Sequence, residues 1–228
     1  MGLTVTSFHA RDRDTDAVIR ALRFGRVLPS WVSSNDSVWV SIFPASAEGR
    51  DPRVLNRIGT ILSRSLDTYV WSVLLHDSTV FQYTVFEQGE IVAEYDSFPE
   101  LSPSMKNGYR DLTAGRPGLM SRLCPGNTSR REIEEVLYRK PRGEALSEIM
   151  EEEKAKDEDE LYSILPADYV HERIMEKRGW PAEEERLAEV ASILDVREAL
   201  LSFGMLEGYY MEEGVPLEFG DCDFIRVT

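Results

Sequence analysis

The 228-residue sequence has few cysteines and histidines, the residues that most often bind zinc. Its two cysteines, Cys124 and Cys222, are far apart and form no CxxC pair. None of the three histidines lies within five residues of another histidine or of a cysteine. Zinc sites need such ligands at short spacing. We therefore expect no metal site, no cofactor and no disulfide, with both cysteines present as free thiols.

Segments for export or membrane insertion are also missing. The N-terminus becomes polar after a few apolar residues, and no apolar run approaches the length of a membrane span. Hydrophobic residues make up 42% of the chain and aromatic residues 10%, which is typical of a folded globular protein. We expect a soluble cytoplasmic protein that does not associate with a membrane.

Sequence motifs for phosphate binding and for a serine nucleophile are absent. The sequence contains no GxxxxGK[ST], no GxGxxG and no GxSxG. The acidic run DEDE at 157–160 lacks the glycine and the terminal glutamate of an EF-hand calcium loop. These absences favour a protein that binds a partner over one that performs catalysis.

The net negative charge of the chain belongs to its second part. Residues 1–130 hold 14 Lys or Arg and 14 Asp or Glu, whereas residues 131–228 hold 12 and 27, so the net charge of −15 belongs to the second part. Such a field repels nucleic acid and attracts basic surfaces. Residues 186–205 resemble a helix-turn-helix in outline, but the second helix offers only Arg197, beside Glu198. Nucleic acid is therefore not an expected partner. The acidic region is either a binding surface or only a solvated one.

The first 98 residues show regular alternation of strand and helix patterns. Alternating apolar residues predict strands at 3–8 and 37–43, and three further strands joined by short turns within 68–97. Apolar stripes with capping residues predict helices at 13–25 and 49–67.

This β-α-β-α-β-β-β pattern predicts an α+β domain over residues 1–98, with one mixed sheet and both helices on one face. The two strand-helix-strand passes would be right-handed crossovers if their strands paired in parallel. Residues 99–128 are rich in Pro and Gly and predict a linker or long loop. Residues 129–228 predict an acidic, mainly helical region. It ends in the strand-like stretches LEGYYME and DFIRV, expected as a separate hairpin or as edge strands of the first sheet.

The stretch HDST places His76, Asp77 and Ser78 side by side, the three residue types of a hydrolase triad. A triad requires these side chains to converge in space, whereas neighbours on a strand point apart, and Asp and Ser are favoured in turns. We predict a hairpin turn. The alternative is a hydrolase-type enzyme with a site around His76, Asp77, Glu94 and Asp96, in which a carboxylate serves as general base.

The second strand of this hairpin has large apolar residues on both faces. Phe81, Tyr83 and Val85 lie on one face, and Val80 and Phe86 on the other. One face can pack on the two predicted helices, and the other needs a cover. We consider three covers: the C-terminal helices, the segment 97–128, or a partner protein.

These observations together predict a non-catalytic module, such as an inhibitor, an immunity-type protein or an adaptor. It would dock a basic protein through its acidic C-terminal surface, with complementary charge setting association rate and selectivity. The candidate binding residues are Glu151, Glu152, Glu153, Asp157, Glu158, Asp159, Glu160, Val80 and Phe86. Two alternatives stay open: the hydrolase-type enzyme, and a structural subunit whose uncovered sheet face forms a homodimer.

Overall fold

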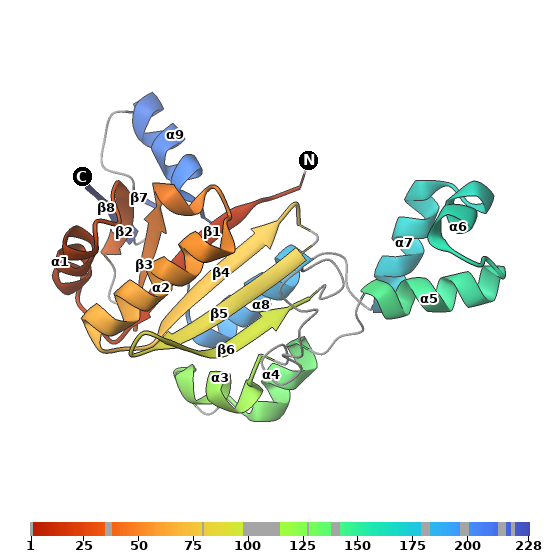
Figure 1. The fold of residues 1–228 in the computed structure, drawn as a ribbon, viewed down its shortest axis with the longest axis horizontal. Coiled ribbons are helices and arrows are strands. Elements are labelled where there is room, and N and C mark those ends of the chain that lie inside the picture. The colour runs from red at the N-terminus through yellow and green to blue at the C-terminus, as the bar shows by residue number, and fades with distance from the viewer. Residues whose placement is uncertain are drawn as a thin grey trace.

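The computed structural model describes residues 2–34, 38–78, 80–97, 115–126, 128–137, 142–178, 183–196, 201–213, 218–219 and 222–228. Figure 1 shows a sheet with helices packed on both of its faces, and a group of three helices that stands to one side. In chain order the elements are β1 (Val5–Arg11), α1 (Thr15–Gly25), β2 (Ser30–Ser34), β3 (Trp39–Pro44), η1 (Ala45–Ala47), α2 (Pro52–Leu66), β4 (Val70–His76), β5 (Val80–Glu87), β6 (Glu90–Asp96), α3 (Pro117–Leu123), α4 (Arg130–Leu137), α5 (Arg142–Glu153), α6 (Glu158–Ile164), α7 (Ala167–Arg178), α8 (Glu183–Leu194), α9 (Phe203–Glu213), β7 (Glu218–Phe219) and β8 (Cys222–Val227).

The strands form one sheet in the order β6-β5-β4-β1-β3-β2-β8-β7, and every neighbouring pair is antiparallel. The four central strands have the order β4-β1-β3-β2, with α1 joining β1 to β2 and α2 joining β3 to β4. This is the split β-α-β, or ferredoxin-like, arrangement. The hairpin of β5 and β6 extends the sheet beyond β4, and β8 and β7 extend it beyond β2.

The predicted α+β class is confirmed, but the predicted mixed sheet is wrong. The prediction missed β2, a five-residue strand of sequence SWVSS that lies between α1 and β3. Once β2 is counted, each helix joins two strands that have a third strand between them. The strands on either side of each helix are then parallel without pairing, and all the paired strands run antiparallel.

Local capping signals place both N-terminal helices where the sequence predicts them. The Asp14 carboxylate accepts a hydrogen bond of 2.7 Å from the backbone N–H of Ala17 at the start of α1. Asp51 caps α2 in the same way, and Pro52 occupies the first helical position. Each cap satisfies a backbone donor that the helix itself leaves without a partner.

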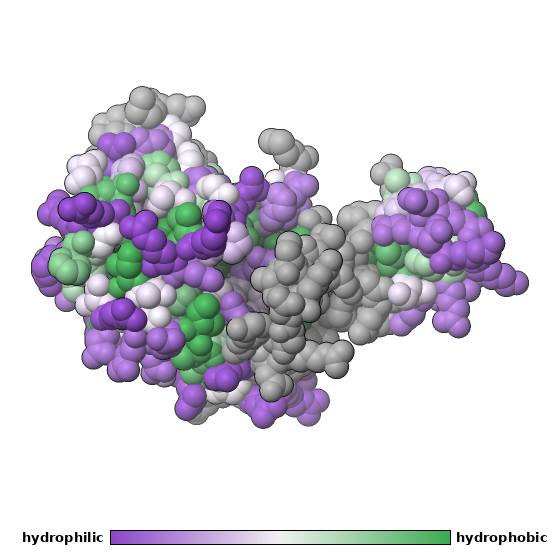
Figure 2. All heavy atoms as spheres, viewed as in Figure 1, coloured by the Kyte–Doolittle hydropathy of each residue, from purple (hydrophilic) through white to green (hydrophobic). Residues whose placement is uncertain are grey.

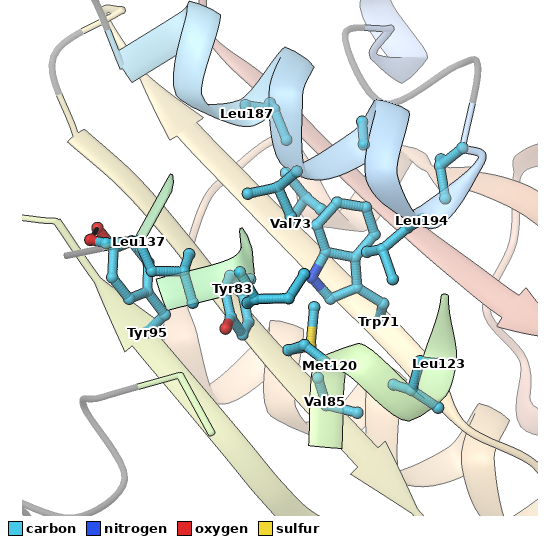
Figure 3. Packing of buried hydrophobic residues seen from close by; sticks show 14 of the residues in the cluster. Trp71, Val73, Tyr83, Val85, Tyr95, Met120, Leu123, Leu137, Leu187 and Leu194 are labelled. Atoms are coloured by element: carbon cyan, nitrogen blue, oxygen red, sulfur yellow. Dashed lines mark hydrogen bonds between the residues drawn. The ribbon is translucent and has the colours of Figure 1, made fainter. Parts of the chain in front are cut away.

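The two faces of the sheet carry two separate apolar clusters. Helices α1 and α2 cover one face, where Phe86 packs directly on Gly59 of α2. Helices α3, α4 and α8 cover the other face. Figure 3 shows Trp71 and Tyr83 of the sheet beneath Leu187 of α8 and Met120 of α3. The second face is therefore covered by C-terminal helices together with α3, a helix that lies within the segment predicted as a linker or loop.

The C-terminal strand completes the sheet. β8 pairs with β2, with Ser30 opposite Val227, so the stretch DFIRV joins the first sheet near its edge, as one of the two alternatives predicted, and the two-residue β7 pairs with β8 beyond it. The stretch LEGYYME is not a strand but part of α9. Leu206 of this helix packs against Trp31 and Phe43 on the sheet, and this tertiary contact outweighs the strand preference of its two tyrosines.

Helices α5, α6 and α7 form a small group with an apolar core of its own. That core consists of Ala145, Leu146, Ile149, Leu161, Val170 and Ile174. Figure 1 shows the group beside the sheet rather than on either face of it. We call residues 142–178 the helical arm. How the chain divides into domains stays a prediction.

Candidate functional site

The residues of the HDST stretch lie where β4 turns into β5. His76 pairs with Val80 across the hairpin, and Asp77 and Ser78 have positive φ angles of 52° and 55°. This confirms the predicted turn. The carboxylate of Asp77 accepts a 2.6 Å hydrogen bond from the N–H of Gly2, and the carbonyl of Ser78 accepts one of 3.1 Å from the N–H of Glu183. The turn thus anchors the N-terminal segment and the start of α8.

The candidate catalytic residues are held by different partners. The Nδ1 atom of His76 lies 2.8 Å from a guanidinium nitrogen of Arg50, and Asp96 accepts a 2.7 Å hydrogen bond from the amide of Gln82. Asp96 lies on β6, two strands away from His76, which corresponds to about 10 Å. Proton transfer needs direct hydrogen-bond distance or one bridging water. The predicted meander is present, but its strand spacing separates the groups that the hydrolase alternative requires.

Glu94, the fourth candidate, is half-buried on β6 opposite Thr84. Loss of hydration raises the pKa of its carboxyl above the ordinary value. A raised pKa suits a general acid. Asp96 pairs with Gln82 and Glu94 with Thr84, however, so Glu94 lies two residues further than Asp96 from the end of β5 that pairs with His76. The described residues therefore bring no imidazole to this carboxyl.

A polar cluster that the sequence did not reveal lies at the centre of the sheet. His9 is fully buried on β1, with Nε2 2.9 Å from Ser7 Oγ and Nδ1 2.8 Å from Ser41 Oγ. Its ring centroid is 5.2 Å from that of Trp71. Burial lowers the pKa of His9 from 6.5 to about 3, so the imidazole is neutral in the folded protein at neutral pH. Because solvent does not reach it, we assign this cluster a structural role.

His9 should make folding sensitive to acid. Its pKa is lower in the folded chain than in the unfolded chain, so the unfolded state binds the proton more readily and stability falls as the pH drops below 6.5. From the pKa of about 3, we expect a loss of about 2 kcal/mol in the free energy of unfolding between pH 7 and pH 5. Urea denaturation followed by circular dichroism at several pH values measures this loss.

Two glutamine variants separate this effect from other titrations. His9→Gln removes the titrating imidazole and should flatten the dependence between pH 7 and pH 5. His76→Gln makes the same substitution at an exposed histidine and serves as the matched control. An unchanged slope in His9→Gln would show that His9 is not the group responsible.

The predicted acidic binding residues all lie in the helical arm, but two of them form ion pairs within it. Glu152 accepts a 2.5 Å hydrogen bond from Lys177 and another from Arg173, and Glu153 accepts one of 2.6 Å from Arg173. The bond to Lys177 lowers the pKa of Glu152. Glu152 and Glu153 therefore join α5 to α7 by ion pairs, which reduces what they can offer to a partner.

The other acidic residues lie at the end of α5 and the start of α6. Asp157 is the N-cap of α6 and accepts a 2.8 Å hydrogen bond from the N–H of Glu160, while the Glu160 carboxylate accepts one from the N–H of Lys156. Because the donors are neutral backbone groups, these bonds do not cancel the charges of the carboxylates. Glu151 and Asp159 are exposed, and Glu158 is partly exposed.

Large apolar side chains accompany this acidic end of the arm. Among the described residues, five large apolar side chains are exposed, and Tyr162 (38%), Ile164 (50%) and Tyr169 (46%) belong to α6 and α7. Figure 2 shows the arm as mostly hydrophilic with apolar patches among the charges. We call Asp157, Asp159, Glu160, Tyr162 and Ile164 the α6 surface. Its apolar members were not predicted, because only the tertiary structure decides which apolar residues of such a short helix face the core.

The other two predicted binding residues lie in the sheet. Phe86 is fully buried against α2, and Val80 is half-buried at the start of β5. The expectation that Phe86 faces a partner is corrected, since the chain's own helix covers it. Both sheet faces are covered in this way, so the described residues leave no open sheet face of the kind on which the homodimer alternative was based.

Within the described residues, no group of three or more His, Cys, Asp or Glu side chains is arranged to hold a metal ion. None of the helices described is both long enough and apolar enough to cross a bilayer. Comparison with protein-family models, with curated proteins and with solved structures found no match.

Proposed function

We propose that the protein is a non-catalytic, cytoplasmic binding module that docks a basic protein through its helical arm, as an inhibitor, an immunity-type protein or an adaptor does. The observation that supports this proposal is the α6 surface, where carboxylates and exposed apolar side chains occur together. Exposed aromatic and aliphatic residues supply binding energy at protein interfaces, and charge at their rim supplies association rate and selectivity.

The net negative charge of the arm also supports the proposal. Residues 142–178 hold 12 Asp or Glu and 6 Lys or Arg. Arg173 and Lys177, two of these cations, are engaged by carboxylates of α5. Asp157 and Glu160 of the α6 surface accept hydrogen bonds from neutral backbone N–H groups, which do not cancel their charge.

The experiment uses the 228-residue chain to capture proteins from its own cells. An identified partner is then purified, and its affinity is measured. We expect Asp159→Lys and Ile164→Ser each to weaken binding by about tenfold. Raising the salt concentration from about 0.05 M to about 0.5 M should weaken binding further, because salt screens the charge attraction.

Two matched variants serve as controls. Asp16→Lys makes the same charge change in the first turn of α1, and Phe24→Ser removes an apolar side chain that is 86% exposed. Neither should alter the affinity. A purified partner that binds Asp159→Lys and Ile164→Ser as tightly as the wild type would contradict the proposal, as would binding that does not depend on salt.

A further inference from the structure

A cavity lined by arginines lies far from the α6 surface in the chain, at the edge of the sheet near β6. It has a volume of about 360 Å³ and is bounded by Tyr69, Glu87, Arg116, Arg122 and Arg130, with Gly118 of α3 also on its wall. Arg116 directly precedes α3, Arg122 lies in α3 and Arg130 in α4, and Figure 1 shows both helices beside the β5–β6 hairpin. Cavities of this size are in the range that proteins use for small molecules. We call it the arginine cavity.

The lining of the arginine cavity is positively charged although the chain as a whole has a net charge of −15. Three arginines face a single carboxylate, that of Glu87. Arg130 forms an ion pair through Nε with Glu134 at 2.7 Å. Within the described residues, Arg116 and Arg122 have no carboxylate at ion-pair distance. Their guanidinium groups are exposed and are available to an anion from solution.

The backbone that carries Arg116 and Arg122 is anchored to the sheet. Gly115, which precedes Arg116, donates its N–H to the carbonyl of Glu94 at 2.8 Å and accepts a 2.7 Å hydrogen bond from the Tyr83 hydroxyl. Leu119 and Leu123 of α3 are buried in the core of the sheet. A preformed site loses less entropy on binding, which favours affinity.

The lining of the cavity also includes groups that suit the organic part of a phosphate ester. Interaction with the Glu87 carboxylate contributes most to raising the pKa of Tyr69. The nearby positive charges of Arg122 and Arg11 act in the opposite direction on the same hydroxyl. A hydroxyl and a carboxylate can hydrogen-bond to the hydroxyl groups of a sugar, and the apolar side chain of Val92 lies beside them.

We propose that the arginine cavity binds a phosphate monoester of a small molecule, with Arg116 and Arg122 contacting the phosphate and Tyr69 and Glu87 contacting the organic part. Planar guanidinium groups bind phosphate through paired, charge-assisted hydrogen bonds, and they do so better than an ammonium group. A sugar phosphate and a nucleoside monophosphate share this chemistry, and separate probes distinguish them.

Isothermal titration calorimetry of the 228-residue chain tests the proposal with ribose 5-phosphate and with AMP. Ribose, adenosine and inorganic phosphate serve as reference compounds. We expect at least one of the two esters to bind and neither ribose nor adenosine to do so. Tighter binding of AMP would identify a nucleoside monophosphate as the ligand type. Tighter binding of ribose 5-phosphate would identify a sugar phosphate. Arg116→Gln and Arg122→Gln should each weaken the binding by about ten- to a hundredfold.

Two further variants control for charge and for space. Arg57→Gln removes an exposed arginine on α2 and should leave the affinity unchanged. Gly118→Leu keeps every charge but should abolish binding by filling the cavity. The helix tolerates a side chain there, since a Cβ at Gly118 would meet only Arg130 Cδ, at 3.9 Å. Circular dichroism confirms that each variant is folded.

Four results would overturn the proposal. The first is that neither ester binds at millimolar concentration, and the second is that both arginine variants and Gly118→Leu bind as the wild type does. The third is that inorganic phosphate binds as tightly as the esters, which would leave no role for an organic part. The fourth is that a phosphoserine peptide binds while both esters fail, which would assign the site to a macromolecule.

Discussion

Replacing Trp39 with alanine is expected to lower the free energy of unfolding by about 3–5 kcal/mol. Trp39 lies on β3 with none of its surface exposed, and its indole N–H donates a 2.8 Å hydrogen bond to the carbonyl of Leu194 at the end of α8. The alanine variant loses the buried ring, leaves a cavity beneath α8, and leaves this carbonyl without its donor. Urea denaturation followed by far-ultraviolet circular dichroism measures the change.

A milder variant separates the hydrogen bond from the ring. Trp39→Phe keeps an aromatic ring in the same cluster but loses the donor, so we expect a smaller loss of about 1–2 kcal/mol. The shape of the unfolding curve is informative as well. A single transition in the wild type indicates that α8 and the sheet unfold together. An alanine variant within 1 kcal/mol of the wild type, a margin of about one ordinary hydrogen bond, would show that α8 does not depend on this contact.

Elements whose signals are local could be predicted from the sequence. Asp51 followed by Pro52 specifies the start of α2 by capping and by a fixed φ angle, and neither depends on the rest of the chain. The strands β4, β5 and β6 could be predicted because large apolar residues recur at every second position along them, and most of these pack into the cluster beneath α3, α4 and α8. The turn at Asp77 and Ser78 was predicted for the same kind of reason, since both residue types favour turns.

Elements that depend on distant contacts were not predicted. β2 is short and rich in serine, and its strand conformation is stabilised by pairing with β3 on one side and with β8, nearly two hundred residues away, on the other. Helix α3 has only seven residues in a segment rich in Pro and Gly, and its buried side chains attach it to the sheet. Pairing and burial of this kind appear only when the chain is folded.

The candidate sites show the same division. The acidic run of the helical arm follows from composition alone, so the sequence revealed it. The ion pairs that join Glu152 and Glu153 to Arg173 depend on how α5 packs against α7. The arginine cavity combines Tyr69 and Glu87 of the first hundred residues with Arg116, Arg122 and Arg130 of the next segment. No sequence spacing links these residues, so only the fold could bring them together.

The second large effect is expected at a buried ion pair on α8. Glu183 and Arg186 are 2% and 1% exposed, their Oε2 and Nη1 atoms are 3.2 Å apart, and the guanidinium also donates a 2.5 Å hydrogen bond to the Tyr95 hydroxyl. Glu183→Gln keeps the size of the side chain but removes its charge and leaves a buried cation. We expect it to lower the free energy of unfolding by about 3–5 kcal/mol, measured by urea denaturation.

Removing both charges should recover much of the free energy of unfolding that Glu183→Gln loses. Arg186→Met alone leaves a carboxylate in the first turn of α8, where the helix dipole favours it, so we expect a smaller cost than that of Glu183→Gln. The double variant Glu183→Gln/Arg186→Met buries no net charge and should come within about 1–2 kcal/mol of the wild type. The coupling energy from this cycle should exceed about 1 kcal/mol, because the two groups are in contact. Single costs that simply add in the double variant would show that the two charges do not stabilise each other, and that Tyr95 alone accommodates the arginine.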